Sequence, residues 1–203
     1  NIKDLEMHIR LNIGLVEIII QNFIPGYGKA INFFSIDGKI KNFFQYKRIH
    51  EPGFGGGSSL RKSSIICDEI YSYSKKIVYK NNYSGIGMIE FRYNPQNNKF
   101  YLMEVNSRFW GSISLPIFAG VNFPKILYNY YLKNKISESH YLSNLYSRHL
   151  LKDIKWIFIK LKKFEFSLFF NEFKRLLIRH SKKTETFDIE KVDDIKPGIF
   201  QLI

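Results

Sequence analysis

The stretch Leu102 to Gly111, LMEVNSRFWG, alternates polar and apolar side chains over its first half. An acid, an amide and an arginine stand two residues apart, at Glu104, Asn106 and Arg108. Because residues two apart share one face of an extended strand, these side chains are expected to point into one cleft. Met103 and Val105 fall on the opposite face, where they are expected to pack into a core. The stretch therefore predicts a strand with one buried face and one chemical face.

A second acid precedes this stretch in another predicted strand. Ile86 to Tyr93 is an apolar run that carries Glu90, and the following Asn94 to Lys99, NPQNNK, has the proline and asparagine content of a turn. The two strands are therefore expected to pair as a hairpin, which brings Glu90 beside Glu104.

Two interpretations of this acid pair follow from the spacing. In the first, Glu90, Glu104 and Asn106 form an all-oxygen cluster of the kind that binds Mg²⁺, which prefers carboxylates, waters and phosphate oxygens. Neighbouring carboxylates repel each other unless a cation separates them. In the second, Glu90 lies at a strand edge and Glu104 pairs with Arg108 on the surface, without a metal. The spacing alone leaves both open.

Composition limits the class of protein. With 203 residues and 45% hydrophobic content, the chain has the size of one domain, with or without an appendage. The single cysteine, Cys67, excludes an internal disulfide and a four-cysteine zinc site and fits a reducing compartment, so a cytoplasmic location is expected. No run approaches the roughly 20 apolar residues of a membrane span, and no signal-peptide pattern is present. The chain begins at Asn1 and soon enters a strand-like segment, so we expect a fragment or a processed start.

The formal net charge of +13 raises the question of a nucleic-acid or membrane partner. Much of the excess is spread through a composition rich in Lys, Asn, Ile, Phe and Tyr, so no specific nucleic-acid partner is predicted. One region, Leu151 to Lys183, concentrates the charge, and two basic amphipathic helices are expected from Leu150 to His180. They are expected to dock their apolar stripe on the rest of the chain. Peripheral association with an acidic membrane surface or a protein partner is the alternative.

Local patterns place the other elements. Asp37 and Gly38 lie between two apolar runs and predict a hairpin, which makes the first third of the chain an antiparallel meander. The expected strands are Gly14 to Ile24, Lys29 to Ile36 and Lys39 to Arg48. The expected helices are Cys67 to Lys80, a short apolar one within Ser112 to Ala119 that stops at Gly120, and Phe123 to Leu132.

A glycine-rich loop follows the meander. Glu51 to Ser59 reads EPGFGGGSS, and consecutive glycines let backbone amides converge on an anion. Because Lys47 and Arg48 precede it, a flap over a phosphate is one interpretation and a plain hairpin exit is the other. The spacing matches neither the Walker pattern nor the dinucleotide fingerprint. His50 is a candidate phosphate donor or acid-base group, although a lone loop histidine is more often neither.

Four motifs follow one another along the chain. They are IIIQNFIPG at 18–26, GGGSS at 55–59, SGIGMIEFRYN at 84–94 and LMEVNSRFWGSISLPIFAGVNFP at 102–124. In this order they resemble the C-terminal half of an ATP-grasp domain. The resemblance is nearest to the ATP-dependent carboxylate-amine ligases of the predicted carboligase group, and the chain is also similar to the carbamoyl-phosphate synthase large chain. It implies an α+β fold, with an antiparallel sheet and packed helices over residues 1–132 and a basic helical extension and tail over residues 133–203.

The resemblance also implies which residues form the site. The metal ligands, for Mg²⁺ or Mn²⁺, would be Glu90, Glu104 and Asn106, and the two acids would also contact ATP. The catalytic residue beside the transferred phosphate would be Arg108. The hinge that meets adenine would be Gln21, Asn22, Phe23 and Ile24. Further phosphate or substrate contacts would come from Arg48 and His50.

The reaction that the resemblance implies begins when ATP phosphorylates a substrate carboxylate, after which an amine attacks the acyl phosphate. Small carboxylates and amines would be the substrates. Two departures from the family pattern are Ser107, where a proline usually follows the asparagine, and the lack of an acid for the ribose near Tyr27 to Ala30. Family members also place another lobe before the hinge, so an N-terminally truncated ligase is expected. The alternative is a non-catalytic remnant that binds an anionic surface or a protein.

Overall fold

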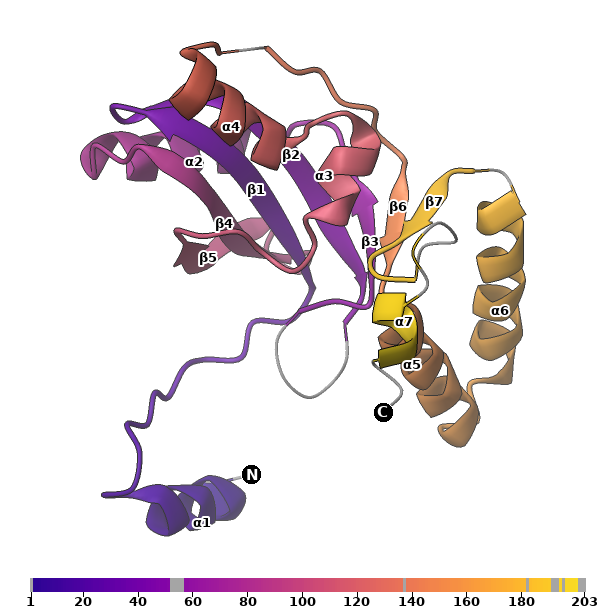
Figure 1. The fold of residues 1–203 in the computed structure, drawn as a ribbon. Coiled ribbons are helices and arrows are strands. Elements are labelled where there is room, and N and C mark those ends of the chain that lie inside the picture. The colour runs from indigo at the N-terminus through magenta and orange to yellow at the C-terminus, as the bar shows by residue number, and fades with distance from the viewer. Residues whose placement is uncertain are drawn as a thin grey trace.

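The structure, a computed structural model, describes residues 2–51, 57–136, 138–181, 183–190, 194 and 196–200. Its centre is one seven-stranded sheet in the order β5-β4-β1-β2-β3-β6-β7 (Figure 1). Neighbouring strands are antiparallel, except that β6 and β7 are parallel. The strands are β1 Tyr27–Ile36, β2 Lys39–His50, β3 Leu60–Ser63, β4 Gly85–Asn94, β5 Lys99–Asn106, β6 Tyr146–Arg148 and β7 Glu185–Phe187. The predicted α+β fold with a mainly antiparallel sheet is confirmed.

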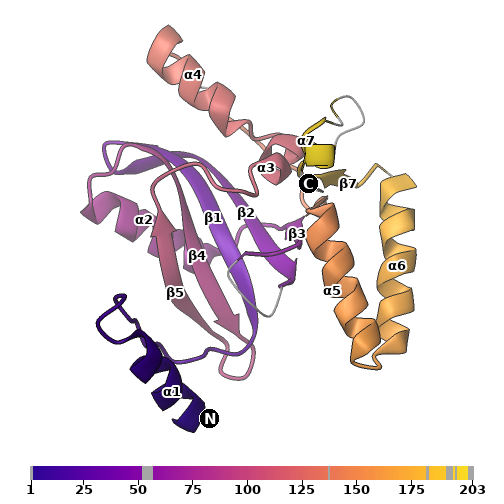
Figure 2. The same cartoon turned by 60° about the horizontal axis from the view of Figure 1, so that its bottom comes forward.

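Helices flank the sheet in three groups. Helix α2 lies against one face, α3 and α4 lie on the opposite side, and α5 and α6 form a hairpin beyond the β3 and β6 strands (Figures 1 and 2). Helix α1 stands at the end of a long extended segment, away from the sheet. The helices are α1 Ile2–Asn12, α2 Asp68–Lys80, α3 Ser114–Ala119, α4 Phe123–Lys133, α5 Leu150–Lys162, α6 Phe166–Ser181 and α7 Lys196–Phe200. None of the helices in the described ranges has the length and apolar content needed to cross a bilayer.

The β1–β2 hairpin forms where the sequence predicts it. Asp37 and Gly38 have φ angles of 48° and 71°, the left-handed pair that a two-residue hairpin turn requires. The α2 helix and the short α3 helix that ends at Gly120 are likewise confirmed. Of the three strands predicted for the meander, the second and third are present as β1 and β2.

The alternation of side chains along the strands divides the core into two layers. On one face, Phe34, Phe44 and Trp110 belong to a buried cluster that continues into α3 and α4. On the other face, residues such as Ile31 and Ile89 pack against the apolar side of α2. Fully burying one such side chain contributes roughly 1.5–3 kcal/mol, so these two layers hold the strands that carry the site in a fixed register.

The prediction of a buried strand over Gly14 to Ile24 is wrong. Residues 15–25 have no strand structure, and side chains such as Ile19, Ile20 and Phe23 are exposed. The β-branched residues favour an extended backbone, but a strand also needs a neighbour for its hydrogen bonds. In the described part of the chain no strand lies beside this segment.

The prediction that Met103 and Val105 pack into a core is also wrong. Their side chains are 47% and 48% exposed, because β5 is the edge strand of the sheet. A register shift opposite Glu90 and Phe91 makes Met103 the extra residue of a β-bulge, which breaks the strict alternation assumed from the sequence.

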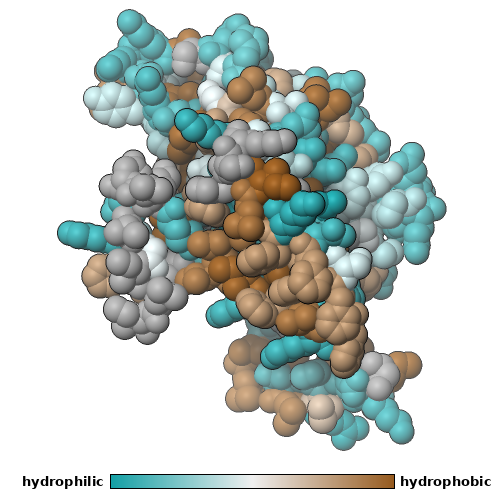
Figure 3. All heavy atoms as spheres, turned by 90° about the vertical axis from the view of Figure 1, so that its right-hand side faces the viewer, coloured by the Kyte–Doolittle hydropathy of each residue, from teal (hydrophilic) through white to brown (hydrophobic). Residues whose placement is uncertain are grey.

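Two short strands and the α5–α6 hairpin make up most of the chain after residue 133. Strand β6 pairs with β3 and β7 pairs with β6, so this region joins the same sheet, which the sequence did not indicate. The two helices predicted between Leu150 and His180 are present. Only part of their apolar surface is docked: Ile157 is buried, whereas many apolar side chains gather on the outer surface where α6 lies (Figure 3).

Candidate functional site

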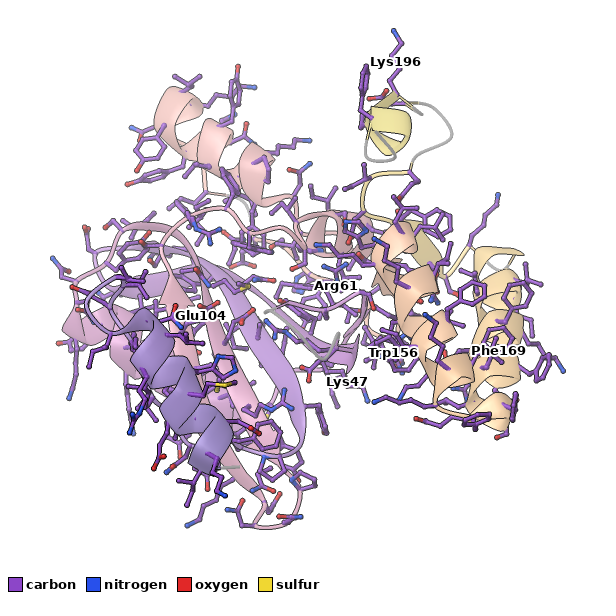
Figure 4. The ribbon with its side chains drawn as sticks, turned by 90° about the horizontal axis from the view of Figure 1, so that it is seen from below. Lys47, Arg61, Glu104, Trp156, Phe169 and Lys196 are labelled. Atoms are coloured by element: carbon purple, nitrogen blue, oxygen red, sulfur yellow. The ribbon has the colours of Figure 1, made fainter. Side chains whose placement is uncertain are left out.

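One large cavity crosses the face of the sheet that faces α5. Its volume is about 1050 Å³. Five adjacent strands contribute lining residues, which are Glu104 on β5, Glu90 on β4, Gly28 on β1, Arg48 on β2 and Arg61 on β3. Helix α5 closes one side with Lys152, Lys155 and Trp156. In Figure 4, seen from below, Glu104 lies on the sheet and Trp156 on α5, with Arg61 between them in this view.

The two acids lie opposite each other, as the hairpin prediction requires. Glu90 on β4 and Glu104 on β5 are direct cross-strand partners, and Met88 faces Asn106 in the same register. The Asn106 side-chain amide donates a hydrogen bond of 2.7 Å to Glu104 Oε1. The alternation of β4 and β5 therefore gathers two carboxylates and one amide on the cavity side of the sheet.

Glu90 is buried, and a positive charge compensates it. Arg48 Nη2 donates to Glu90 Oε2 over 2.5 Å from two strands away. Burial raises the pKa of Glu90, the charge of Arg48 opposes this rise, and the carboxylate of Glu104 adds to it, so that the pKa lies above its usual value. The guanidinium of Arg48 thus supplies the positive charge that the two facing acids need.

The donor set has the chemistry of a site for a hard cation. The described residues contain no group of three or more His, Cys, Asp or Glu side chains that could hold a metal ion. They do present the facing carboxylates of Glu90 and Glu104 with the carbonyl oxygen of Asn106 on one surface. Mg²⁺ commonly takes one or two carboxylates and completes its shell with water and phosphate oxygens, so these residues fit that ion.

A second ion-pair cluster, which the sequence did not reveal, supports one end of the cavity. Glu51, at the end of β2, accepts a 2.9 Å hydrogen bond from Gly28 N and a 2.6 Å hydrogen bond from Arg92 Nη1. Arg92 also donates to the carbonyl oxygens of Ile24 and Gly26, over 2.9 and 2.7 Å. These bonds attach the predicted hinge to the sheet. The sequence gives little signal of this cluster, because its partners lie 23 positions apart or more.

The four predicted hinge residues differ in whether they contact the cavity or the sheet. Gln21 lines the cavity, and Ile24 is held through its carbonyl oxygen by Arg92. Asn22 and Phe23 are exposed and are not part of the cavity lining. The predicted contacts of these residues with adenine stay predictions.

Arg108 lies where the alternate spacing predicts it. It lines the cavity, with Glu104 and Asn106, and is exposed. Its Nη1 donates to the carbonyl oxygen of Phe109 over 3.0 Å. The alternative in which Glu104 pairs with Arg108 is not observed, since Glu104 bonds to Asn106 instead.

His50 faces the helical hairpin and is not among the cavity-lining residues. Its Nδ1 lies 2.8 Å from Asp153, its Nε2 lies 3.4 Å from Glu172, and its ring stacks on Trp156 with centroids 3.7 Å apart. Burial lowers the pKa of His50, but the hydrogen bonds and charges of the two acids outweigh this and raise it above 6.5. The contacts observed here join β2 to α5 and α6, and they do not support the predicted contact with a phosphate.

Of the glycine loop, Gly53, Gly55 and Gly56 lie outside the described residues. Gly57 and Ser58 line the cavity, and Ser59 Oγ donates to Asp153 over 2.7 Å. The loop therefore leaves and re-enters the sheet beside the cavity, and its predicted role as a phosphate flap stays a prediction.

The far end of the cavity is formed by residues that the sequence did not single out. Arg61 on β3 is buried and pairs with Asp188, which also accepts hydrogen bonds from Ser114 and Ser147. His149 and Lys152, at the start of α5, line the same end. Arg61 and Asp188 are 127 positions apart, so no local pattern indicates that they meet.

Comparison with known proteins gives a family and a fold. A family model described as "ATP-grasp in the biosynthetic pathway with Ter operon" matches residues 15–149. The search of curated proteins gave no match. Among solved structures, the chain is similar to N5-carboxyaminoimidazole synthetase from Staphylococcus aureus complexed with ADP (16% identity, TM-score 0.57, 72% of this chain and 40% of that one). It is also similar to an L-amino acid ligase from Bacillus licheniformis (21% identity, TM-score 0.50, 66% of this chain and 35% of that one).

These solved structures share the fold at low identity, and the chain spans less than half the length of either. The family match covers well over half of this chain, from before the hinge to the start of α5, and includes both facing acids. On this match, the chain belongs to the ATP-grasp family.

Proposed function

We propose that this chain carries the catalytic face of an ATP- and Mg²⁺-dependent ligase that joins a carboxylate to an amine through an acyl phosphate. The observation that carries the proposal is the cross-strand pair of Glu90 and Glu104, with Asn106 beside them, on the wall of one large cavity. Membership of the ATP-grasp family supports an ATP-dependent ligase-type function. The reaction would take place in the cytoplasm, where a free thiol such as that of Cys67 persists.

The chemistry consists of two displacements. An oxygen of the substrate carboxylate attacks the γ-phosphorus of ATP, the bond to the bridging oxygen breaks, and ADP leaves. The amine nitrogen then attacks the acyl carbon, phosphate leaves with the electron pair of the C–O bond, and the nitrogen loses a proton. Neither step needs a side-chain nucleophile, so binding and charge compensation carry the catalysis.

We call Glu90, Glu104, Asn106, Arg48 and Arg108 the acid pole of the cavity, and each of these residues has a distinct part in this proposal. Glu90, Glu104 and Asn106 would hold Mg²⁺, which neutralises phosphate charge when bound. Arg48, already paired with Glu90, lowers the pKa of that acid against the effect of its burial and would turn toward a phosphate when a metal takes its place. Arg108, exposed on the cavity wall, would contact the phosphoryl group or the acyl phosphate.

The test begins with binding, since the solved relatives are longer than this chain. Mg-ADP is titrated into the protein by calorimetry, and Glu104→Gln is compared with Glu165→Gln, which removes an acid of the α5–α6 hairpin that pairs with Lys160. We expect Glu104→Gln to weaken Mg-ADP at least tenfold and Glu165→Gln to leave it unchanged. Equal affinity in all three proteins would refute the site.

The acyl phosphate has its own test. Hydroxylamine traps an acyl phosphate as a hydroxamate, so incubation with ATP, Mg²⁺ and a panel of carboxylates should yield hydroxamate in proportion to ADP. ADP formation without hydroxamate, for every carboxylate tested, would mean that ATP hydrolysis does not pass through this intermediate.

A second candidate function has support in the α5–α6 hairpin. Phe164, at its tip, is 79% exposed and adopts a φ of 60°, which is unfavourable for a residue with a large side chain. On α6 an exposed apolar stripe continues from it at helical spacing, formed by Phe166, Phe170, Phe173 and Leu177. Lys162 and Lys163 precede the tip.

We propose that this tip docks on an anionic lipid surface, because exposed aromatic side chains beside lysines match the apolar and negative layers of such a surface. Vesicles with phosphatidylserine should bind the protein at low salt, and binding should fall steeply as salt rises. Phe164→Ser should weaken binding, whereas Phe23→Ser, a similarly exposed site outside the hairpin, should not. Equal binding to vesicles of phosphatidylcholine alone, or no effect of Phe164→Ser, would exclude this function.

A further inference from the structure

The cavity is wider than the acid pole requires. Glu104 lies on β5 and Arg61 on β3, and three strands separate them in the sheet. At about 4.8 Å between neighbouring strands, the two residues stand roughly 19 Å apart along a flat sheet, or less on a twisted one. A reacting carboxylate beside Arg108 therefore leaves the Arg61 end of the cavity for another part of a ligand.

The Arg61 side chain has an unused donor. The residue is only 5% exposed, and one terminal nitrogen pairs with Asp188. Its Nε has no hydrogen-bond partner among the described residues. Leaving a buried, charged donor unpaired is costly, so a nearby acceptor on a ligand would bind strongly here. Asp188 does not meet this need, because it already accepts from Arg61 and from two serines.

The first turns of α5 add donors to the same end. His149 Nδ1 is buried without a partner in the described part of the chain. Burial lowers the pKa of His149 and the charge of Lys152 lowers it further, which outweighs the opposite effect of nearby acids and favours the neutral ring, in which one nitrogen carries a hydrogen. Lys152 and Lys155 line the cavity close to it along the helix. Arg61, Lys152 and Lys155 are cationic and Asp188 is acidic, so this end of the cavity carries a net positive charge.

We infer that the Arg61 end, defined as Arg61, His149, Lys152 and Lys155, binds a second anionic group, a carboxylate or a phosphate, on the acid substrate. The substrate class is then a dianionic acid: one carboxylate reacts at the acid pole and the other anion is held at the Arg61 end. This assignment rests on the proposed function for the reacting group. The binding of an anion by the Arg61 end is separate from it and can be measured without turnover.

The experiment follows the Arg61 Nε–H resonance by NMR, assigned through its loss in Arg61→Lys. Glutarate, butyrate and inorganic phosphate are titrated into the full chain. Glutarate should shift this resonance with saturation in the millimolar range, and butyrate should need at least tenfold higher concentration. No shift with either glutarate or phosphate would overturn the inference.

Matched variants locate the binding on the helix. Lys152→Gln and His149→Gln should each weaken glutarate at least threefold, whereas Lys162→Gln, on the same helix but outside the cavity lining, should change nothing. An equal loss in Lys162→Gln would show that the attraction comes from general charge and would overturn the inference.

Mg-ADP separates this inference from the proposed function. If glutarate binds with the expected variant pattern but Mg-ADP does not bind, the anion site stands and the ligase proposal fails. If Mg-ADP binds, loses affinity in Lys152→Gln and is displaced by glutarate, the Arg61 end holds nucleotide phosphate and the assignment to the substrate is overturned. A shift with phosphate but not glutarate limits the second anion to phosphate.

Discussion

The two ends of the sheet use charged residues in opposite ways. At the β5 end, Glu104 is exposed, and the Asn106 amide is the hydrogen-bond donor observed for it. At the β6–β7 end, Arg148 and Asp153 are fully buried and bound to each other. Charges whose bonds are completed inside the protein stabilise the fold, whereas charges left facing a cavity are available to a ligand. The structure therefore separates a structural end from a binding end within one sheet.

The structural end is a continuous network. Arg148 bonds to Asp153 and reaches Glu185 on β7 over 2.5 Å. Asp153 also accepts a hydrogen bond from Ser59 over 2.7 Å. It accepts another from His50 over 2.8 Å when His50 is protonated, the state that the raised pKa of His50 favours. Burial raises the pKa of Asp153, but these bonds and the charge of Arg148 outweigh it, so the pKa is lowered. The network links β2, β6, β7 and α5.

The largest effect is expected for Arg148→Met. The substitution leaves Asp153 and Glu185 buried without the guanidinium that compensates them, and breaking a buried ion pair typically costs about 3–5 kcal/mol. Urea unfolding followed by circular dichroism should show a loss of this size. The matched variant Arg108→Met, at the binding end, should change the free energy of unfolding by less than about 0.5 kcal/mol. Similar losses in both variants would contradict the division between the two ends.

His50 makes the structural end sensitive to pH, and its effect should be the second largest. The charged groups that face it are Asp153 on α5 and Glu172 on α6, and Arg148 reaches the former from β6. The folded-state pKa of His50 is raised, so its contribution is fully present below the unfolded pKa of about 6.5 and is lost as pH rises through the folded value. A hydrogen bond to a charged group contributes about 1.5–3 kcal/mol.

The measurement compares wild type with His50→Gln by urea unfolding between pH 6 and pH 9. At pH 6 the variant should be less stable by up to that amount, and the difference should shrink as the pH rises. Because the pKa values of Asp153 and Glu172 are lowered, their contributions are kept over this whole range and are lost only on acidification. A difference that grows with pH would show that His50 is neutral in the fold.

Local sequence patterns were sufficient to predict the arrangement of the binding end. Alternate spacing in Glu104 and Asn106 and a turn-rich connection to Glu90 were enough to predict the hairpin and the facing acids, because both depend on neighbours along the chain. The same holds for the Asp37 turn, where two residues determine the conformation.

The structural end could not be predicted in this way. Strands β6 and β7 have three residues each, too few to show an alternation, and their place depends on ion pairs such as that between Arg148 and Glu185. The Arg61 end of the cavity is assembled from β3, α5 and the tail, so its residues carry no common spacing. The strand predicted over Gly14 to Ile24 is absent for the converse reason: its composition favours a strand, but the described sheet offers it no neighbour.

Glu104→Gln should change the free energy of unfolding by less than about 0.5 kcal/mol in the absence of nucleotide, since Glu104 is exposed and its replacement keeps an acceptor for Asn106. The same variant should lose the rise in melting temperature that Mg-ADP gives the wild type, because a ligand stabilises only the form that binds it. Thermal unfolding with and without Mg-ADP measures both quantities. A large loss of stability without ligand would place Glu104 among the structural residues.

The smallest effect is expected at Val105 on the edge strand. Its side chain is about half exposed, so Val105→Thr should cost less than about 0.5 kcal/mol. Ile89, its cross-strand partner on β4, is fully buried against the α2 layer, and Ile89→Thr should cost about 2 kcal/mol or more because it also buries a hydroxyl. Urea unfolding of both variants compares positions that are adjacent in the sheet. If Val105→Thr lowered the free energy of unfolding as much as Ile89→Thr, Val105 would be buried in solution. The β5 edge would then not be open, and the contrast between an open binding end and a closed structural end would fail.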